Sequence, residues 1–174
     1  MKEIALEAGL AAGSLYVYLR SKEEILLLLA ESMISELLEA LPAIRRDSQG
    51  DPRKELLGMM RGAIDVIDRY REAFAVLNHE IRYLERQPEQ NGILKGVIEP
   101  YRNAISDPII QGKALGLIRF ESLNCAVEAI HMLCSGWATG GRFLAKTDKE
   151  TYWREIAGIV EGRFFAPSLG GGIS

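Results

Sequence analysis

The sequence predicts an all-α protein. Apolar residues recur three and four residues apart along most of the chain, which is the spacing of helices with one buried face. Residues that favour the start of a helix occur ahead of several of these apolar patterns, at Ser21, Asp51 and Thr147-Asp148. The 174 residues are 48% hydrophobic and 26% charged, so the chain can bury a sizeable core.

The first 24 residues are predicted to form two short helices joined by a turn. Ile4 and Ala8 lie four residues apart ahead of Gly9, which can adopt the left-handed backbone conformation that ends a helix. Leu15 and Leu19, also four residues apart, give the second helix its buried side. The arrangement is that of a helix-turn-helix.

A long helix is predicted from Lys22 to about Asp47. The sequence Ser21-Lys22-Glu23-Glu24 fits a capping box, in which the serine hydroxyl accepts from the amide of Glu24. The helix is expected to bury one stripe, which consists of Ile25, Leu29, Met33, Leu37 and Leu41. Gln49-Gly50 is predicted to be a loop.

Three helical segments are predicted in the middle of the chain. Asp51-Pro52 opens the first, with aspartate as the cap and proline at the first helical position. The second is expected over residues 73–87, residues 88–92 as a loop, and the third over 91–114. Because the third segment contains Pro100 and Asp107-Pro108, it either kinks or consists of two helices.

Two further helices are predicted near the end of the chain. The first spans residues 121–144 and is apolar over a wide arc, so it needs cover from its own domain and from a partner. The second begins after Thr147-Asp148. Residues 167–174 contain three consecutive glycines and are expected to be a flexible tail.

The first 25 residues contain a pattern at fixed spacing, which consists of Ile4-Ala5, Ala8-Gly9, Gly13, Leu15-Tyr16, Tyr18 and Ser21-Lys22-Glu23-Glu24-Ile25. This pattern resembles the DNA-binding signature of TetR-family (tetracycline-repressor-like) transcriptional regulators. The alternative for this stretch is an ordinary helical hairpin. The resemblance implies a helix-turn-helix DNA-binding domain in residues 1–24, a helical effector-binding and dimerisation domain in 25–166, and the tail in 167–174. The family pattern has one more helix before Ile4, so the DNA-binding domain is N-terminally incomplete in this sequence. Either the sequence is part of a longer protein, which we expect, or the protein has an incomplete DNA-binding domain.

The resemblance further implies that residues 12–20 enter the major groove of a double-stranded DNA operator. The net charge of -3 means that DNA contacts must be local. Alanine and glycine side chains carry no hydrogen-bond donors, so specificity would depend on Ser14, Tyr16, Val17 and DNA shape. The expected DNA-contacting residues are Ala11, Ala12, Gly13, Ser14, Tyr16, Val17, Tyr18 and Lys22.

The resemblance also implies a pocket for a small-molecule effector, which we expect to be largely apolar, and a homodimer built by the last two helices. The expected pocket residues, for each of which plain core packing is the alternative, are Met60, Ile64, Leu77, Asn78, Tyr101 and Ile105. The expected interface residues, which would form a four-helix bundle with a second subunit, are Val127, Ile130, Cys134, Ile156, Val160 and Phe164.

The favoured function is that of a repressor released from its operator by a small molecule. The alternative is a helical dimeric ligand-binding or scaffold protein that no longer binds DNA. No phosphate-binding glycine loop or nucleophile elbow occurs, so neither an enzyme with catalytic residues nor a cofactor is expected.

The sequence predicts no metal site, disulfide or membrane-spanning segment. His79 and His131 are interpreted as structural residues rather than metal ligands. Cys125 and Cys134, nine residues apart on one helix, are expected to be two buried thiols and not a disulfide. No apolar run reaches the length needed to span a membrane, so we expect a cytoplasmic protein without membrane partners.

Overall fold

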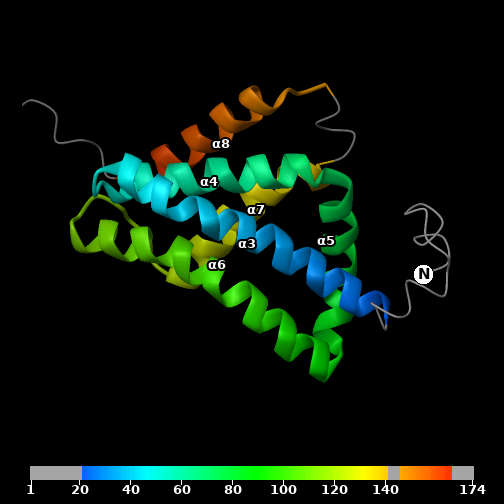
Figure 1. Cartoon of the computed structure of the whole chain (residues 1–174). Coiled ribbons are helices and arrows are strands. Elements are labelled where there is room, and N and C mark those ends of the chain that lie inside the picture. The colour runs from blue at the N-terminus through cyan, green and yellow to red at the C-terminus, as the bar shows by residue number, and fades with distance from the viewer. Residues whose placement is uncertain (1–20, 141–145, 166–174) are drawn as a thin grey trace, which may run out of the picture.

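The computed structural model describes residues 21–140 and 146–165, which form six α-helices and no strand (Figure 1). The predicted all-α class is therefore confirmed. Residues 1–20 and 166–174 lie outside the described residues, so the division at residues 24 and 166 stays a prediction. The helices are α3 (Lys22–Ser48), α4 (Pro52–Arg69), α5 (Arg71–Arg86), α6 (Pro88–Ala114), α7 (Leu123–Thr139) and α8 (Lys149–Phe164).

The predicted helix starts are confirmed at atomic detail. The Ser21 hydroxyl accepts from the amide of Glu24 at 3.2 Å, and α3 then continues to Ser48. The Asp51 carboxylate accepts from the amide of Arg53 at 2.9 Å, with Pro52 as the first residue of α4. The Asp148 carboxylate caps α8 in the same way. Each cap satisfies an amide that would otherwise lack a partner at the start of a helix.

The loop predicted over residues 88–92 is wrong, because α6 begins at Pro88. Proline is well tolerated at the first helical position, where its missing N–H would have no intrahelical acceptor. The helix then runs through Pro100 and Pro108 to Ala114 as one element. Of the two possibilities for this segment, the structure contains the single helix.

Helix α3 crosses the middle of the molecule between α4 and α6 (Figure 1), and it also contacts α5. α7 packs against α4 and α6, and α8 packs against α7 and α4. The larger hydrophobic core lies between α4, the C-terminal halves of α3 and α6, α7 and α8. A smaller cluster joins the N-terminal half of α3 to α5 and α6, and it consists of Leu26, Leu27, Ala30, Leu77, Leu84 and Leu94. No described helix is both long and apolar enough to cross a membrane.

The two cysteines are free, and they differ in environment. Cys134 is buried and Cys125 is exposed, so the predicted burial of Cys125 is wrong. Nine residues turn an α-helix by about 180°, which places the two thiols on opposite faces of α7. Burial raises the pKa of the Cys134 thiol to about 12.

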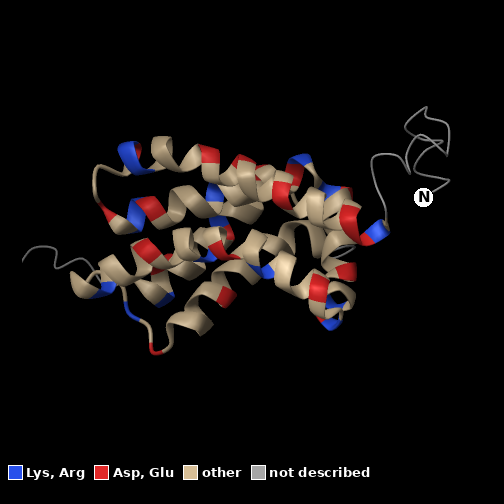
Figure 2. Cartoon of the chain, turned by 60° about the horizontal axis from the view of Figure 1, so that its bottom comes forward, with Lys and Arg blue, Asp and Glu red and all other residues tan. Residues whose placement is uncertain are grey.

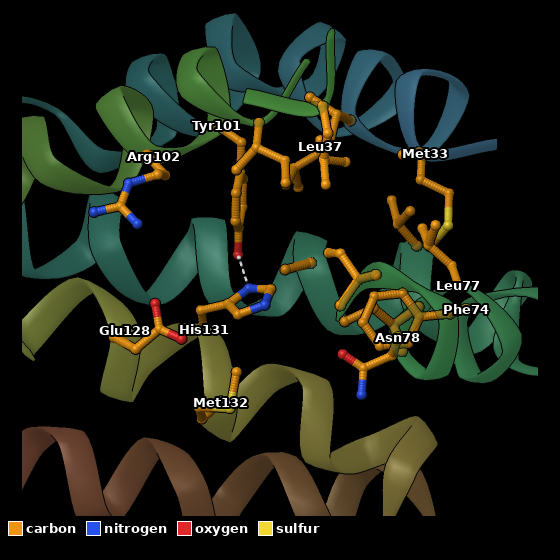
Figure 3. Close-up of a pocket in the computed structure, with 18 of the residues that line it drawn as sticks. Met33, Leu37, Phe74, Leu77, Asn78, Tyr101, Arg102, Glu128, His131 and Met132 are labelled. Carbon is orange, nitrogen blue, oxygen red and sulfur yellow. Dashed lines mark hydrogen bonds between the residues drawn. The ribbon is translucent and has the colours of Figure 1, made fainter. Parts of the chain in front are cut away.

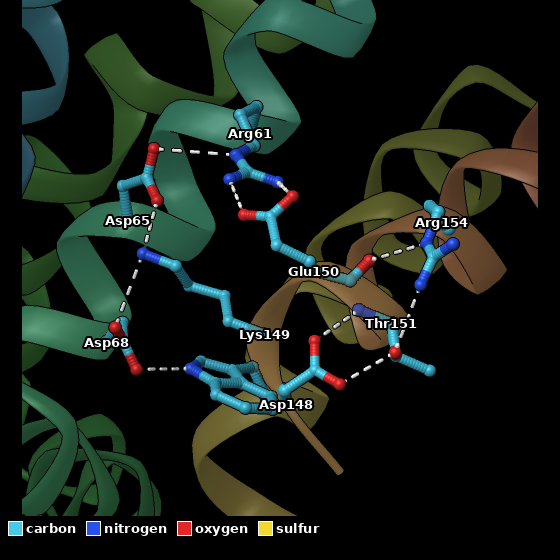
Figure 4. A network of polar contacts seen from close by, with 9 residues as sticks. Arg61, Asp65, Asp68, Asp148, Lys149, Glu150, Thr151 and Arg154 are labelled. Atoms are coloured by element: carbon cyan, nitrogen blue, oxygen red, sulfur yellow. Dashed lines mark hydrogen bonds and ion pairs between the residues drawn. The ribbon is translucent and has the colours of Figure 1, made fainter.

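A network of charged residues holds the first turn of α8 against α4 (Figure 4). Lys149 Nζ lies 2.8 Å from a carboxylate oxygen of Asp65 and 3.4 Å from one of Asp68. Arg61 and Glu150 form an ion pair with two hydrogen bonds between the same two helices. Because these charges are partly exposed and interlinked, their main effect is to fix the position of α8.

A close approach at the end of α6 requires a glycine. A Cβ atom added at Gly112 would lie 2.5 Å from Cδ1 and 2.6 Å from Cγ1 of Ile118, which is buried. The carbonyl of Gly112 accepts from the amides of Leu117 and Ile118 at 2.8 and 3.0 Å, so the turn cannot easily move away.

Gly112→Ala is therefore expected to lower the free energy of unfolding by about 1–3 kcal/mol, as overpacking of a buried site does. Gly96→Ala is the matched control in the same helix, because a Cβ atom there meets nothing within 4 Å. That variant should be more stable than the wild type by about 0.5–1 kcal/mol. Urea denaturation of both variants measures the difference, and equal stabilities would contradict the packing described at Gly112.

Candidate ligand-binding site

A cavity of about 280 Å³ lies where α3, α4, α5, α6 and α7 meet (Figure 3). It sits between the larger core and the smaller cluster, because residues of both contribute to its wall. The apolar lining consists of Ala30, Met33, Ile34, Leu37, Ala63, Val66, Ile67, Phe74, Leu77, Ile81, Leu94, Ile98, Val127 and Met132. The polar and charged lining consists of Asn78, Glu85, Tyr101, Arg102, Glu128 and His131. A mainly apolar wall with a few polar groups is typical of small-molecule sites.

Three of the six expected pocket residues line this cavity, namely Leu77, Asn78 and Tyr101. The other three, Met60, Ile64 and Ile105, are buried in the core and are not part of the lining. The backbone carbonyl of Met60 lies 3.8 Å from the Cys134 thiol, within the contact between α4 and α7. Binding of a ligand by any of the six stays a prediction.

The polar end of the cavity is formed by Tyr101 of α6 and His131 of α7 (Figure 3). The Tyr101 hydroxyl lies 3.4 Å from Nδ1 of His131, and the two rings meet edge to face with their centroids 5.8 Å apart. Nε2 of His131 lies 3.3 Å from the Ser135 hydroxyl, one turn further along α7. The imidazole is thus hydrogen-bonded on both sides, and it links the cavity to a buried serine.

Burial favours the neutral form of both rings. Burial lowers the pKa of His131, the nearby guanidinium of Arg102 lowers it further, and the carboxylate of Glu128 acts in the opposite direction. Burial also raises the pKa of the Tyr101 phenol well above its usual range. The charged side chains at the lining are one cation, Arg102, and two carboxylates, Glu85 and Glu128. The cavity therefore has no net positive charge that would attract an anion.

His131 lies in the cavity wall, which goes beyond the structural role that the sequence favours for it. A sequence signal for this position exists, because Glu128, His131 and Ser135 follow one another at spacings of three and four residues. Such residues lie on one face of a helix, and here they form a polar stripe on a helix that is otherwise largely apolar. His79, by contrast, is exposed and lies 3.5 Å from the carboxylate of Glu80.

Of the eight expected DNA-contacting residues, only Lys22 lies among the described residues. The other seven, which are Ala11, Ala12, Gly13, Ser14, Tyr16, Val17 and Tyr18, lie outside them. Lys22 is the first residue of α3, and its Nζ forms an ion pair of 3.0 Å with Glu80 of α5. Basic and acidic residues are interspersed along the described helices (Figure 2). DNA contact by any of the eight residues stays a prediction.

All six expected interface residues are buried within the single chain. Their side chains belong to the larger core, and Phe164, the most exposed of Val127, Ile130, Cys134, Ile156, Val160 and Phe164, is 9% exposed. The opposite side of the same two helices carries exposed apolar residues. Met132 and Ile159 are 50% and 54% exposed, and with Cys125, Ala129 and Leu133 they line a shallow groove between α7 and α8.

Comparison with known proteins reveals likeness in structure and not in sequence. No protein-family model matches the sequence, and no curated protein matches it. Several solved structures are similar to this chain over more than nine-tenths of its length, with sequence identities of 22% or less.

Three of these structures are transcriptional regulators. The ketosteroid transcriptional regulator KstR2 of Mycobacterium tuberculosis has a TM-score of 0.75 at 22% identity, over 95% of this chain and 84% of that one. The TetR-family regulator PfmR of Thermus thermophilus has a TM-score of 0.76 at 18% identity, over 93% and 87% of the two chains. A tetR-family regulatory protein from Rhodococcus RHA1 has a TM-score of 0.76 at 17% identity, over 91% and 82%. This chain therefore has the all-α fold of TetR-family transcriptional regulators.

Proposed function

We propose that this protein is a transcriptional repressor that leaves its operator when a small molecule enters the cavity. The observation that carries the proposal is the position of α3. This helix begins directly after the predicted helix-turn-helix, and its residues Ala30, Met33 and Leu37 form one wall of the cavity. A ligand in the cavity would therefore act on the helix that connects the effector-binding domain to the predicted helix-turn-helix domain.

The two ends of α3 are held differently. Near its C-terminal end, Arg45 pairs with the buried carboxylate of Glu55 at 3.0 Å and with Asp107 at 3.2 Å, which ties α3 to α4 and α6. The N-terminal half packs on the smaller cluster and forms one ion pair, between the exposed Lys22 and the partly buried Glu80. A ligand that pushes on the middle of α3 would therefore move its N-terminal end most.

A movement of the N-terminal end of α3 would alter DNA binding if two subunits bind the operator as a dimer. A two-fold dimer reads successive major grooves about 34–36 Å apart, so a shift of a few Å at each head disrupts binding. We place the dimer interface on the groove between α7 and α8, because that surface exposes apolar side chains on adjacent helices. Cytoplasmic location and the absence of catalysis belong to the same proposal.

The experiment that tests this function is selection of genomic DNA fragments by the full chain, followed by fluorescence anisotropy with the selected duplex. Binding that is specific for that duplex and falls steeply with salt supports the regulator. A folded dimer that binds small molecules and retains no duplex would support the alternative, a ligand-binding or scaffold protein.

Lys22→Ala is expected to weaken operator binding by roughly tenfold at 0.1 M salt and to reduce the slope of log affinity against log salt by about 1, because one phosphate contact is lost. Glu80→Gln should strengthen operator binding, since it frees the Lys22 ammonium from its ion pair. Lys95→Ala is the control, an exposed lysine of α6. If all three variants bind with the wild-type slope, Lys22 does not contact the DNA.

A further inference from the structure

We infer that the cavity selects uncharged, mainly apolar molecules with one carbonyl or hydroxyl group, which hydrogen-bonds to Tyr101 at the end of the Tyr101–His131–Ser135 relay. This inference rests on the proposed role of the cavity as the effector site. It names the chemical class of the ligand and the residues that determine it.

The apolar side chains that line the cavity determine the apolar part of the ligand. Met33 and Leu37 of α3 face Phe74 and Leu77 of α5 across the cavity (Figure 3), and Tyr101 closes one end between them. An apolar chain or ring in this space would contact side chains on each of the surrounding helices. Methionine side chains adapt to ligands of different shape.

The polar part of the ligand is set by the relay, which can work in two directions. If Nδ1 of His131 donates to the Tyr101 oxygen, the tyrosine O–H is free to donate to a ligand carbonyl, and the Ser135 hydroxyl donates to Nε2. If instead the Tyr101 O–H donates to Nδ1, its oxygen can accept from a ligand hydroxyl, and Nε2–H donates to Ser135. A hydroxyl group can donate or accept, so both tautomers of the neutral imidazole keep all their partners.

An anionic head group is disfavoured in the same place. The phenol and the imidazole are both neutral, so neither compensates the charge of a buried carboxylate. The lining contains one cation, Arg102, and two carboxylates, Glu85 and Glu128, so its formal charge is not positive. Transfer of a carboxylate from water into this cavity is therefore unfavourable relative to an alcohol or ketone of the same length.

The test compares three probes of equal chain length, 1-octanol, 2-octanone and octanoate, by isothermal titration calorimetry at pH 7. We expect the alcohol and the ketone to bind with similar affinity and octanoate to bind at least tenfold more weakly. Tyr101→Phe should weaken the alcohol and the ketone by about tenfold each, which corresponds to one hydrogen bond. Tyr70→Phe is the matched control, because this half-buried tyrosine packs against the core outside the cavity.

Octanoate binding as tight as 1-octanol, no binding of either neutral probe, or an unchanged affinity in Tyr101→Phe would each overturn the inference. DNA binding is measured on the same preparations. Salt-dependent operator binding without a preference for the neutral probes would leave the regulator intact and remove the ligand class. A preference for the neutral probes without DNA binding would support the ligand class and contradict the proposed regulator.

Discussion

Ile159→Glu is expected to dissociate the proposed dimer into monomers and, with it, to abolish the proposed tight binding to an operator. Ile159 is 54% exposed in the single chain and lies on the groove between α7 and α8, so the substitution leaves the core of the subunit intact. In a two-fold interface the same residue occurs on both subunits, so two carboxylates would be desolvated together. We expect the dissociation constant of the dimer to rise by at least about a hundredfold.

Sedimentation velocity measures the change, and circular dichroism checks that the monomers are folded. Ile93→Glu is the control, because Ile93 is a similarly exposed isoleucine on α6, outside the groove. If Ile159→Glu stays dimeric while folded, the interface lies on another surface. A charged residue at Val160 would not make this distinction, because that side chain is fully buried in its own subunit.

Trp137→Ala is expected to lower the free energy of unfolding by about 3–5 kcal/mol, a large share of the stability of a domain of this size. The indole is 4% exposed, its N–H donates to Asp68 at 2.7 Å, and the guanidinium of Arg71 lies 4.4 Å from the ring centroid. Its ring centroid also lies 5.4 Å from that of Tyr152. The substitution thus removes packing between α4, α7 and α8 at one point. Trp153→Ala, at a half-buried tryptophan of α8, should lower the free energy of unfolding by less.

The smaller change Trp137→Phe adds a test of pH dependence. The indole N–H lowers the pKa of Asp68, with Lys149 in support, because it hydrogen-bonds to the charged carboxylate. This contribution to stability is present above the usual carboxyl pKa of about 4 and is lost as the pH falls through the lowered value. The difference in stability between wild type and Trp137→Phe should therefore be larger at pH 7 than at pH 2. A difference that does not change with pH would contradict the charged hydrogen bond.

The fold could be predicted because its signals are local. Ser21, Asp51 and Asp148 cap helices within a few residues of themselves, and the apolar stripes follow the 3.6-residue period. The start of α6 at Pro88 could not be predicted in the same way, because a proline between two helical patterns fits both a loop and a first helical turn.

The cavity could be predicted only in part, because an apolar residue at helical spacing can either pack in the core or line the cavity. Met60 and Leu77 have the same helical signature, yet the first lies in the core and the second lines the cavity. The six expected interface residues lie on the sides of α7 and α8 that are buried within the single chain, and contact of any of them with a second subunit stays a prediction. One of them, Phe164, also lines the groove between α7 and α8. Which stripe meets a partner depends on the tertiary packing of α8 on α4 and α7, which no local pattern contains.

The proposed control of DNA binding by the cavity is tested most directly by measuring the thermodynamic linkage between the two ligands. The affinity of the selected operator is measured with and without saturating 1-octanol, and the affinity for 1-octanol with and without saturating operator. We predict that each ligand lowers the affinity for the other by the same factor, on the order of tenfold, as linkage requires. Two affinities that are each unaffected by the other ligand would show that the cavity does not control DNA binding.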